Sequence, residues 1–553
     1  MNRQFKRVSI LVSTLVPLLT LNLWSEPNTS KTLPCTRGAI QRAALSDTTI
    51  VAATWQSNPV SYCDVRGYVT TNNPGPNQVN FELGLPTEWN GRFLFIGTGG
   101  FAGSFDFGAV LLDLLHPFPL QDEVSAGFAT AITDTGHQGT GDFPFLDGSW
   151  ALNDLAKQND WLFRSVHVST VTGKTITQAF YGNTAHSYFA GCSTGGREGL
   201  LEAEQYPKDF DGIVVGDPAI GSNFLGANWN SEHLTATADN YIPVEKLALI
   251  DAIVMQSCDA TDGLLDGLIQ DPRKCTFKPA GLLCTQGDNS DCLTAGQVGS
   301  LDAIYAGAST ADGRQVYPGF TQSDSTGNPN LIIGDEGWGL WITGFVPPDA
   351  PGTAEPWTNP AFAPWGFTLQ DQFLKYFVFS DPNYNSLSFD INTGDLAKAR
   401  AIINRGGAAG TNPDLSAFRN HGGKLLLYHG WSDPAISPLE TVHYYSNVVR
   451  EQDGLSSAQQ FARLFMVPGM RHCIGSGGPG PNVFDPLTSA IDWVEKGKAP
   501  DRIIGVHFQD NDPSTGVITR TLPLCPYPEQ AAFLGGDVND AANWSCKRPH
   551  NDQ

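Results

Sequence analysis

The sequence predicts an α/β fold in which helices cover both faces of a mostly parallel sheet. Short apolar segments typical of buried strands alternate with segments whose apolar residues recur at helical spacing. The alternation runs from about residue 77 to 220, stops, and resumes after residue 420. With 553 residues, 41% of them hydrophobic, the chain suits one large domain with an insertion, or two to three smaller domains.

The expected elements before residue 221 follow one another at short intervals. The segment 77–100 fits two strands separated by an Asn90-Gly91 turn and followed by a glycine-rich loop. A buried strand and polar loop are expected at 127–137, a helix at 153–180, a strand at 186–191, a helix that Pro207 ends, and a strand at 210–220.

The segment 221–420 breaks this pattern. It is rich in Gly, Pro, Asp and Asn, contains four of the ten cysteines, and clusters aromatic residues between Trp338 and Phe379. Strand-like segments return at 423–436 and 462–473. We therefore expect an inserted domain. Its aromatic residues would either line a pocket or form the core of the insertion.

Net charge and the N-terminus limit the partners and the compartment. With 33 Lys and Arg against 56 Asp and Glu, the net charge of −23 argues against nucleic acid or an anionic membrane as partner. Residues 1–25 combine Arg3, Lys6 and Arg7 with an apolar run and predict a signal peptide and a secreted or periplasmic protein. An uncleaved membrane anchor is the alternative, although Pro17 interrupts the run.

An even number of cysteines in an exported chain indicates disulfide bonds rather than a metal site. No C-x-x-C spacing occurs, which weakens a zinc interpretation. The spacing suggests four local pairs and leaves Cys192 and Cys473 over. The local pairs are Cys35 with Cys63, Cys258 with Cys275, Cys284 with Cys292, and Cys525 with Cys546.

One short motif carries a chemical hypothesis. Residues 191–195, Gly-Cys-Ser-Thr-Gly, fit the G-x-S-x-G turn that presents a nucleophilic serine between a strand and a helix. In α/β hydrolases an acid and then a histidine follow the serine, each after a later strand. Ser193, Asp433 and His472 have this order and setting, and Asp217 in "GDPA" is a competing acid.

The two remaining cysteines strengthen this hypothesis. A bond between Cys192 and Cys473 would hold their Cα atoms about 4.4–6.8 Å apart. It would therefore bring Ser193 and His472, their direct neighbours in the chain, into the same small volume.

At this point the chain resembles a known family. "GCSTGG", "HGWSDP" and "MRHC" together resemble the tannase and feruloyl esterase family, in which a disulfide links the Cys-Ser and His-Cys parts of the site. The resemblance runs from about Cys35 to Cys546 and includes "GTGGFAGS", "TDTGH", "GDPA" and "KYFVFSDPNYN". It implies an α/β-hydrolase fold with a catalytic domain of residues 26–220 and 421–553 and an inserted lid domain of residues 221–420.

The resemblance also implies roles for the motif residues. Ser193 would be the nucleophile, His472 the general acid and base, and Asp433 the residue that orients His472. Backbone N–H groups of Thr194 and Gly100 would form the oxyanion hole.

A second predicted site lies in the insertion, within residues 258–275. Asp259, Asp262 and Asp266 offer hard oxygen ligands, and the carbonyls of Leu264 and Leu268 would complete a structural Ca²⁺ shell. The family's calcium site falls at the matching positions. An acidic turn between helices is the alternative.

The substrate pocket is less well defined by the sequence. Ile436 is a candidate pocket wall, and Lys375 a candidate partner for the carboxylate of a terephthalate half-ester, with a solvent-facing lysine as the alternative. Thr194 stands where the terephthalate branch of the family has glutamate. Asp134 and His137 are expected to be hydrogen-bond partners that brace their loop, with a catalytic role as the alternative.

The motifs predict a secreted serine hydrolase, and the resemblance implies that it cleaves carboxylic esters of the feruloyl, galloyl or terephthalate type through an acyl-enzyme. Its partner would be a small aromatic ester, with no redox or organic cofactor. A peptidase or amidase with the same triad, and an inactive polyphenol- or glycan-binding protein of the same fold, are the alternatives. The sequence does not predict an oligomeric state.

Overall fold

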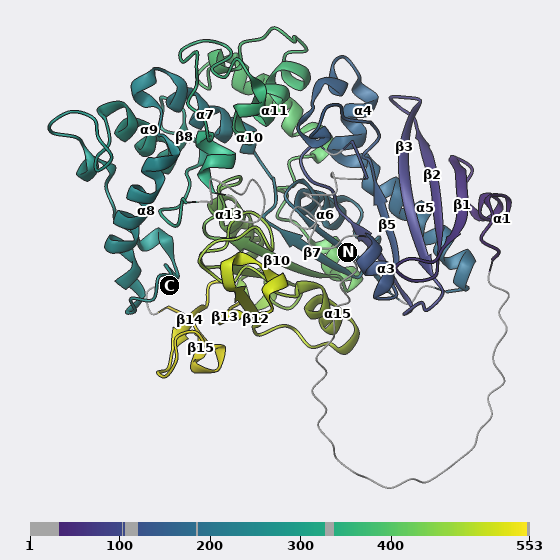
Figure 1. The fold of residues 1–553 in the computed structure, drawn as a ribbon. Coiled ribbons are helices and arrows are strands. Elements are labelled where there is room, and N and C mark those ends of the chain that lie inside the picture. The colour runs from purple at the N-terminus through teal and green to yellow at the C-terminus, as the bar shows by residue number, and fades with distance from the viewer. Residues whose placement is uncertain (1–32, 102, 106–119, 184–185, 327–336, 550–553) are drawn as a thin grey trace.

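The computed structural model describes residues 33–101, 103–105, 120–183, 186–326 and 337–549 (Figure 1). The predicted signal peptide lies outside these ranges. None of the described helices is long and apolar enough to cross a bilayer.

A nine-stranded sheet forms the centre of the described chain, in the order β1-β2-β3-β5-β4-β6-β7-β10-β11. Neighbouring strands are parallel from β5 to β11 and antiparallel from β1 to β5. The sheet thus matches the predicted α/β class. Its strands are β1 (Thr48–Gln56), β2 (Tyr62–Thr71), β3 (Asn77–Pro86), β4 (Arg92–Ile96), β5 (Ala129–Thr133), β6 (His186–Cys192), β7 (Gly212–Gly216), β10 (Lys424–Gly430) and β11 (Ala462–Val467).

Helices cover both faces of the sheet because its central strands are apolar on both sides. In β10, Leu425 and Leu427 belong to the core shared with α5 (Ser165–Tyr181), α6 (Thr194–Gln205) and α13 (Pro438–Glu451). Leu426 faces the opposite core, to which α15 (Pro486–Lys496) contributes. Shorter helices are α1 (Arg37–Ala43), α3 (Leu120–Ser125), α4 (Leu155–Asn159), α12 (Ser416–His421) and α14 (Leu455–Ala458).

The chain leaves the sheet after β7 and returns to it at β10, so the predicted insertion lies between two adjacent strands. In Figure 1 its elements gather at the top and upper left. The regular elements of the insertion are mostly helices joined by long loops, and most of its large aromatic residues are buried in its cores. It contains α7 (Asn223–Thr235), α8 (Val244–Cys258), α9 (Ala295–Ala306), α10 (Trp365–Gln372), α11 (Gly394–Ile403) and the hairpin β8 (Gly307–Ser309) and β9 (Gln315–Pro318).

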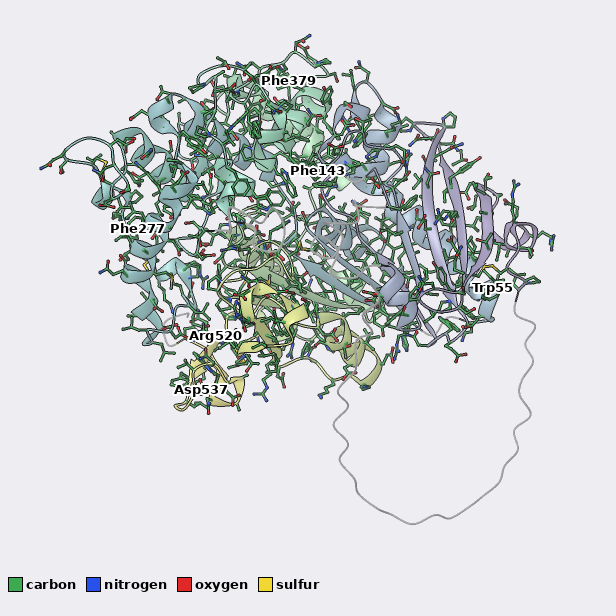
Figure 2. All side chains as sticks on the ribbon, in the orientation of Figure 1. Trp55, Phe143, Phe277, Phe379, Arg520 and Asp537 are labelled. Carbon is green, nitrogen blue, oxygen red and sulfur yellow. A yellow bond between two sulfur atoms is a disulfide. The ribbon has the colours of Figure 1, made fainter. Side chains whose placement is uncertain are left out.

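Two regions contain strands that the sequence did not predict. At the N-terminus, β1 forms the sheet edge, where Trp55 remains 53% exposed (Figure 2). At the C-terminus, two small antiparallel ribbons carry Arg520 and lie near Asp537 (Figure 2). These ribbons consist of β12 (Ile503–Phe508) with β13 (Ile518–Leu524), and β14 (Gln530–Phe533) with β15 (Trp544–Lys547).

All ten cysteines form disulfide bonds, and the pairs are those that the spacing suggested. The bond between Cys192 and Cys473 spans 281 positions and joins β6 to the loop after β11. The other four bonds close short stretches of chain, of 8 to 28 positions. In these four, Cys35 is bonded to Cys63, Cys258 to Cys275, Cys284 to Cys292, and Cys525 to Cys546.

Candidate active site

Ser193 occupies the sharp turn between β6 and α6. Its φ of 62° and ψ of −124° are a conformation that non-glycine residues rarely adopt. Glycines allow the turn to pack closely, because a Cβ at Gly191 would lie 2.7 Å from the Gly195 backbone. The turn therefore holds the serine at the carboxyl end of the parallel strands.

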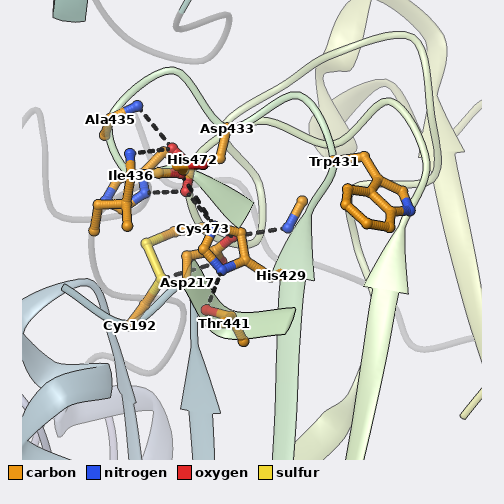
Figure 3. A network of polar contacts seen from close by, with 12 residues as sticks. Cys192, Asp217, His429, Trp431, Asp433, Ala435, Ile436, Thr441, His472 and Cys473 are labelled. Carbon is orange, nitrogen blue, oxygen red and sulfur yellow. Dashed lines mark hydrogen bonds and ion pairs between the residues drawn. A yellow bond between two sulfur atoms is a disulfide. The ribbon is translucent and has the colours of Figure 1, made fainter. Parts of the chain in front are cut away.

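The disulfide bond and a shared cavity bring Ser193 and His472 together. The Cα atoms of Cys192 and Cys473 lie 6.0 Å apart (Figure 3). Ser193 and His472 line the same cavity, and the Trp341 ring contacts the His472 ring edge-on, with centroids 5.2 Å apart. The predicted proximity of serine and histidine is thus present in the fold.

Asp433 is the carboxylate that contacts His472. Its Oδ2 lies 2.8 Å from His472 Nδ1, and its Oδ1 accepts the backbone N–H groups of Ala435 and Ile436 at 2.7 and 2.9 Å (Figure 3). Burial opposes ionisation of Asp433, but the adjacent His472 and hydrogen bonds from His472 and His429 hold its pKa far below the usual value. Asp433 is therefore charged and fixed in position.

A second histidine, His429, lies behind this pair and is fully buried. Its Nε2 is 3.1 Å from Asp433 Oδ2 and 3.6 Å from Asp217 Oδ1, while Nδ1 lies 2.7 Å from Thr441 Oγ1 (Figure 3). Asp217, the competing acid, accepts the N–H of Gly430 at 2.8 Å, and burial is the main reason that its pKa rises to about 7. The competing acid Asp217 thus lies behind this pair, beside His429, while Asp433 contacts Nδ1 of His472.

The insertion holds the two loops that carry Asp433 and His472. Asp324 accepts hydrogen bonds from Arg471, the residue before His472, at 2.6 and 2.9 Å. Ser323 donates to the carbonyl of Trp431, two residues before Asp433, at 3.1 Å. Sequence reasoning missed this clamp because nothing in the insertion's composition distinguishes Asp324 from its other acidic residues.

The cavity at the triad has a volume of about 680 Å³, including its part open to solvent, and an apolar lining. No Asp, Glu, Lys or Arg contributes to this lining among the described residues. Ile436 lies in the wall, as predicted, and so do Gly100 and Thr194, the residues predicted to form the oxyanion hole. The lining residues are Gly99, Gly100, Phe145, Ser193, Thr194, Ala219, Asn223, Phe224, Ala227, Trp341, Gly366, Leu369, Ala435, Ile436 and His472.

The four short-range disulfide bonds have no part in this cavity. None of their cysteines is among the described residues that line it. They act on the fold instead, since each ties together segments near in sequence, such as β2 and the segment before α1 at the Cys35–Cys63 bond. The cysteines concerned are Cys35, Cys63, Cys258, Cys275, Cys284, Cys292, Cys525 and Cys546.

Lys375 does not line this cavity, so the structure does not support its predicted contact with a substrate carboxylate. Its Nζ forms an ion pair with Asp371 at 2.8 Å, one helical turn earlier. The lysine side chain is only 14% exposed, so the solvent-facing alternative does not describe it either. An acidic neighbour four residues away neutralises it locally.

Gly100 and Thr194 both line the cavity beside Ser193. A Cβ at Gly100, whose φ is 55°, would lie 2.7 Å from the carbonyl oxygen of Phe145. The glycine loop is tied to α6 because Glu198 accepts the N–H and hydroxyl of Thr98 at 2.9 and 3.1 Å. This arrangement positions two backbone segments near the serine.

In the loop after β5, Asp134 accepts hydrogen bonds from Asn80, Gly136 and Gln138 and so braces its loop as expected. His137 is not its partner. The ring of His137 stacks on Trp150, with centroids 3.5 Å apart.

The predicted calcium loop contains acidic groups close enough to affect one another. Burial, followed by the charges of Asp266 and Asp259, raises the pKa of Asp262 to about 6. Oδ2 of Asp266 is buried without a hydrogen bond and lies 3.9 Å from Arg520 Nη1. These oxygen donors suit a hard cation in chemical type. However, the carboxylates of Asp259, Asp262 and Asp266 do not all lie within 4.8 Å of one another, as the ligand atoms do in three other clusters of Cys, His, Asp or Glu among the described residues.

The fold and this site define an α/β hydrolase with a serine, histidine and aspartate at the carboxyl edge of its sheet. A family model described as tannase and feruloyl esterase matches residues 63–547. The chain belongs to this family of carboxylic-ester hydrolases.

Several named relatives cover most of the chain. Mono(2-hydroxyethyl) terephthalate hydrolase of Piscinibacter sakaiensis is 32% identical and aligns over 92% of this chain and 88% of its own length. Feruloyl esterase C of Talaromyces stipitatus is 31% identical over 89% of this chain and 87% of its own. The crystal structure of feruloyl esterase B from Aspergillus oryzae matches with a TM-score of 0.74 and 26% identity, covering 92% of this chain and 100% of that one.

Proposed function

We propose that this protein hydrolyses carboxylic esters of aromatic acids through an acyl-enzyme, with Ser193 as nucleophile. The observation that carries the proposal is the 2.8 Å contact between Asp433 and His472, in a loop that the disulfide bond ties to the serine turn. Because the buried carboxylate holds Nδ1, Nε2 of His472 is the atom that acts as base.

The reaction follows from this arrangement. His472 takes the proton of the Ser193 hydroxyl as the serine oxygen attacks the ester carbonyl, and the backbone N–H groups of Thr194 and Gly100 stabilise the oxyanion. Collapse expels the alcohol, which receives the proton from His472. Water, activated by the same histidine, then hydrolyses the acyl-enzyme and releases the acid.

The lining supports an aromatic and uncharged acyl group. The wall contains Phe145, Phe224 and Trp341 and, among the described residues, no charged side chain. The named relatives include a feruloyl esterase and a mono(2-hydroxyethyl) terephthalate hydrolase at similar identity, so the uncharged lining decides the order. We therefore place neutral phenolic acyl esters ahead of terephthalate half-esters as substrates.

A substrate panel tests this function. Methyl ferulate and methyl gallate should be hydrolysed with a higher kcat/KM than mono(2-hydroxyethyl) terephthalate, and the matched amides should react far more slowly. Ser193→Ala should abolish turnover but preserve binding. Amide cleavage at rates equal to the esters would favour a peptidase, and binding without turnover by the wild type would favour an inactive binding protein.

We further propose a structural calcium ion held by the carboxylates of Asp259, Asp262 and Asp266 and the carbonyls of Leu264 and Leu268. The mutual repulsion at Asp262 and the unbonded Oδ2 of Asp266 support it. A chelator should lower the Tm and added Ca²⁺ restore it. Asp262→Asn should remove that response, whereas Asp291→Asn, in an exposed loop, should keep it.

We also propose that the protein is exported to the periplasm or the medium. The apolar N-terminal segment and five disulfide bonds support this compartment. N-terminal sequencing of the protein from each cell fraction would test it: a mature chain that begins after about residue 25 supports export, and an intact N-terminus in the membrane fraction supports an anchor.

A further inference from the structure

A second cavity adjoins the active-site cavity and contains a buried arginine. It has a volume of about 340 Å³, including its part open to solvent. Four residues line both cavities: Thr194, Ala219, Asn223 and Phe224. Its remaining walls are apolar except for Arg197, from side chains such as Leu162, Phe373 and Ile403.

Arg197 is buried without an acidic partner. It lies near the start of α6, is 6% exposed, and has no carboxylate of the described residues within 4.0 Å of its guanidinium nitrogens. The guanidinium lies 4.2 Å from the ring centroid of Trp161, and Nη2 donates to the Trp161 carbonyl at 3.4 Å. Within the described part of the chain, no group accepts a hydrogen bond from Nε.

The acid next to it in sequence does not neutralise this charge by contact. Glu198 directs its carboxylate to Thr98, whose N–H and hydroxyl it accepts. Burial is the main reason that the pKa of Glu198 rises to about 7, and the charge of Arg197 opposes part of this rise without a contact between the two groups. Burial also lowers the pKa of Arg197 to about 10, which leaves the guanidinium charged.

A buried charge that no carboxylate contacts is unfavourable, and a guanidinium with an unused donor offers directed hydrogen bonds to an anion. The contact with the Trp161 ring offsets part of this cost, because an aromatic face attracts a cation. It leaves Nε unsatisfied, however. An anion in the adjoining cavity would provide both a negative charge in contact with the guanidinium and the missing acceptor for Nε.

We propose that the Arg197 cavity binds a small monovalent anion, either a halide or a short carboxylate. The apolar walls limit its size and exclude a strongly hydrated or multivalent ion. The wall shared by the two cavities places this anion near Thr194. A change in turnover caused by the anion would therefore rest on the proposed function. Anion binding itself requires no catalysis and can be tested separately.

Thermal unfolding in matched sodium salts tests the site. In bromide and in acetate, the Tm of the wild type should exceed its Tm in gluconate by about 2 °C, because ligand binding stabilises the folded state. The bromide arm reports a halide and the acetate arm a carboxylate. Arg197→Gln should abolish both differences, whereas Arg405→Gln, which removes an arginine bonded to Gln158, should retain them.

Equal Tm values of the wild type in all three salts, or the same differences in Arg197→Gln, would overturn the proposal. Crystals of the wild type soaked in bromide provide a test that does not depend on folding of the variant. An anomalous peak within hydrogen-bonding distance of Arg197 Nε supports the site, and its absence at high bromide occupancy elsewhere contradicts it. Neither the Tm difference nor the bromide peak requires the protein to hydrolyse esters, so each tests the anion site even if the proposed function is wrong.

Discussion

The sheet and the insertion contribute to the site in different ways. The sheet supplies Ser193, Asp433 and His472 from loops after β6, β10 and β11, and Cys192–Cys473 locks two of these loops together. The insertion supplies Trp341 and other pocket walls, and Asp324 clamps the histidine loop. In the proposed mechanism the reacting groups therefore come from the sheet, whereas the insertion shapes the pocket and holds the two loops in place.

The largest expected effect distinguishes the two buried acids of the sheet. Asp433→Asn should lower kcat by about 10⁴-fold, because the amide no longer selects the productive tautomer of His472. Asp217→Asn should lower kcat much less, since Asp217 lies beside His429 while Asp433 holds Nδ1 of His472. Steady-state kinetics on methyl ferulate would compare them, and equal losses would contradict the assignment.

Removing the long disulfide should weaken both folding and turnover. For the double variant Cys192→Ala/Cys473→Ala we expect a loss of about 4 kcal/mol in the free energy of unfolding, because the bond closes 281 positions. Turnover should fall as the serine and histidine loops move apart. The matched control for denaturation and kinetics replaces Cys284 and Cys292, whose bond spans 8 positions, with alanine. Similar losses in both double variants would argue against a positioning role.

The clamp from the insertion should have a smaller effect on the reaction. Asp324→Asn leaves Arg471 buried with a weaker partner, so we expect a loss of about 3 kcal/mol in stability and roughly a tenfold loss in kcat. Asp312→Asn, at an exposed pair with Arg314, should change neither. A stability loss without any loss of kcat would limit the insertion to forming the pocket.

The smallest expected effect is a change in the stability of the fold with pH. Burial raises the pKa of Asp217 from its ordinary value near 3.8 to about 7, so ionising this group destabilises the fold. Protonated Asp217 therefore adds to the free energy of unfolding. This contribution is fully present below the ordinary pKa near 3.8 and is lost as the pH rises through about 7. Relative to Asp217→Asn, the wild type should lose stability between pH 4 and 8. Chemical denaturation at both pH values would check this, and an opposite trend would contradict it.

The sequence predicted the parts of the molecule that periodicity and motifs determine. Strands such as β11 coincide with apolar runs. Cys192 and Cys473, the sequence neighbours of Ser193 and His472, indicated a contact between these distant segments. The prediction that Lys375 contacts the substrate was wrong. The lysine pairs instead with Asp371, one helical turn earlier, and does not line the cavity. The unpaired charge of Arg197 and the clamp at Asp324 depend on how the insertion packs, which no local pattern reports.

Active-site labelling followed by peptide mapping tests the central claim most directly. A fluorophosphonate that reacts with activated serines should form one adduct, on the peptide containing Ser193. Ser193→Ala and His472→Ala should lose it, in parallel with the loss of ester hydrolysis. An adduct on a different residue, or full hydrolytic activity in Ser193→Ala, would contradict the proposed catalytic site.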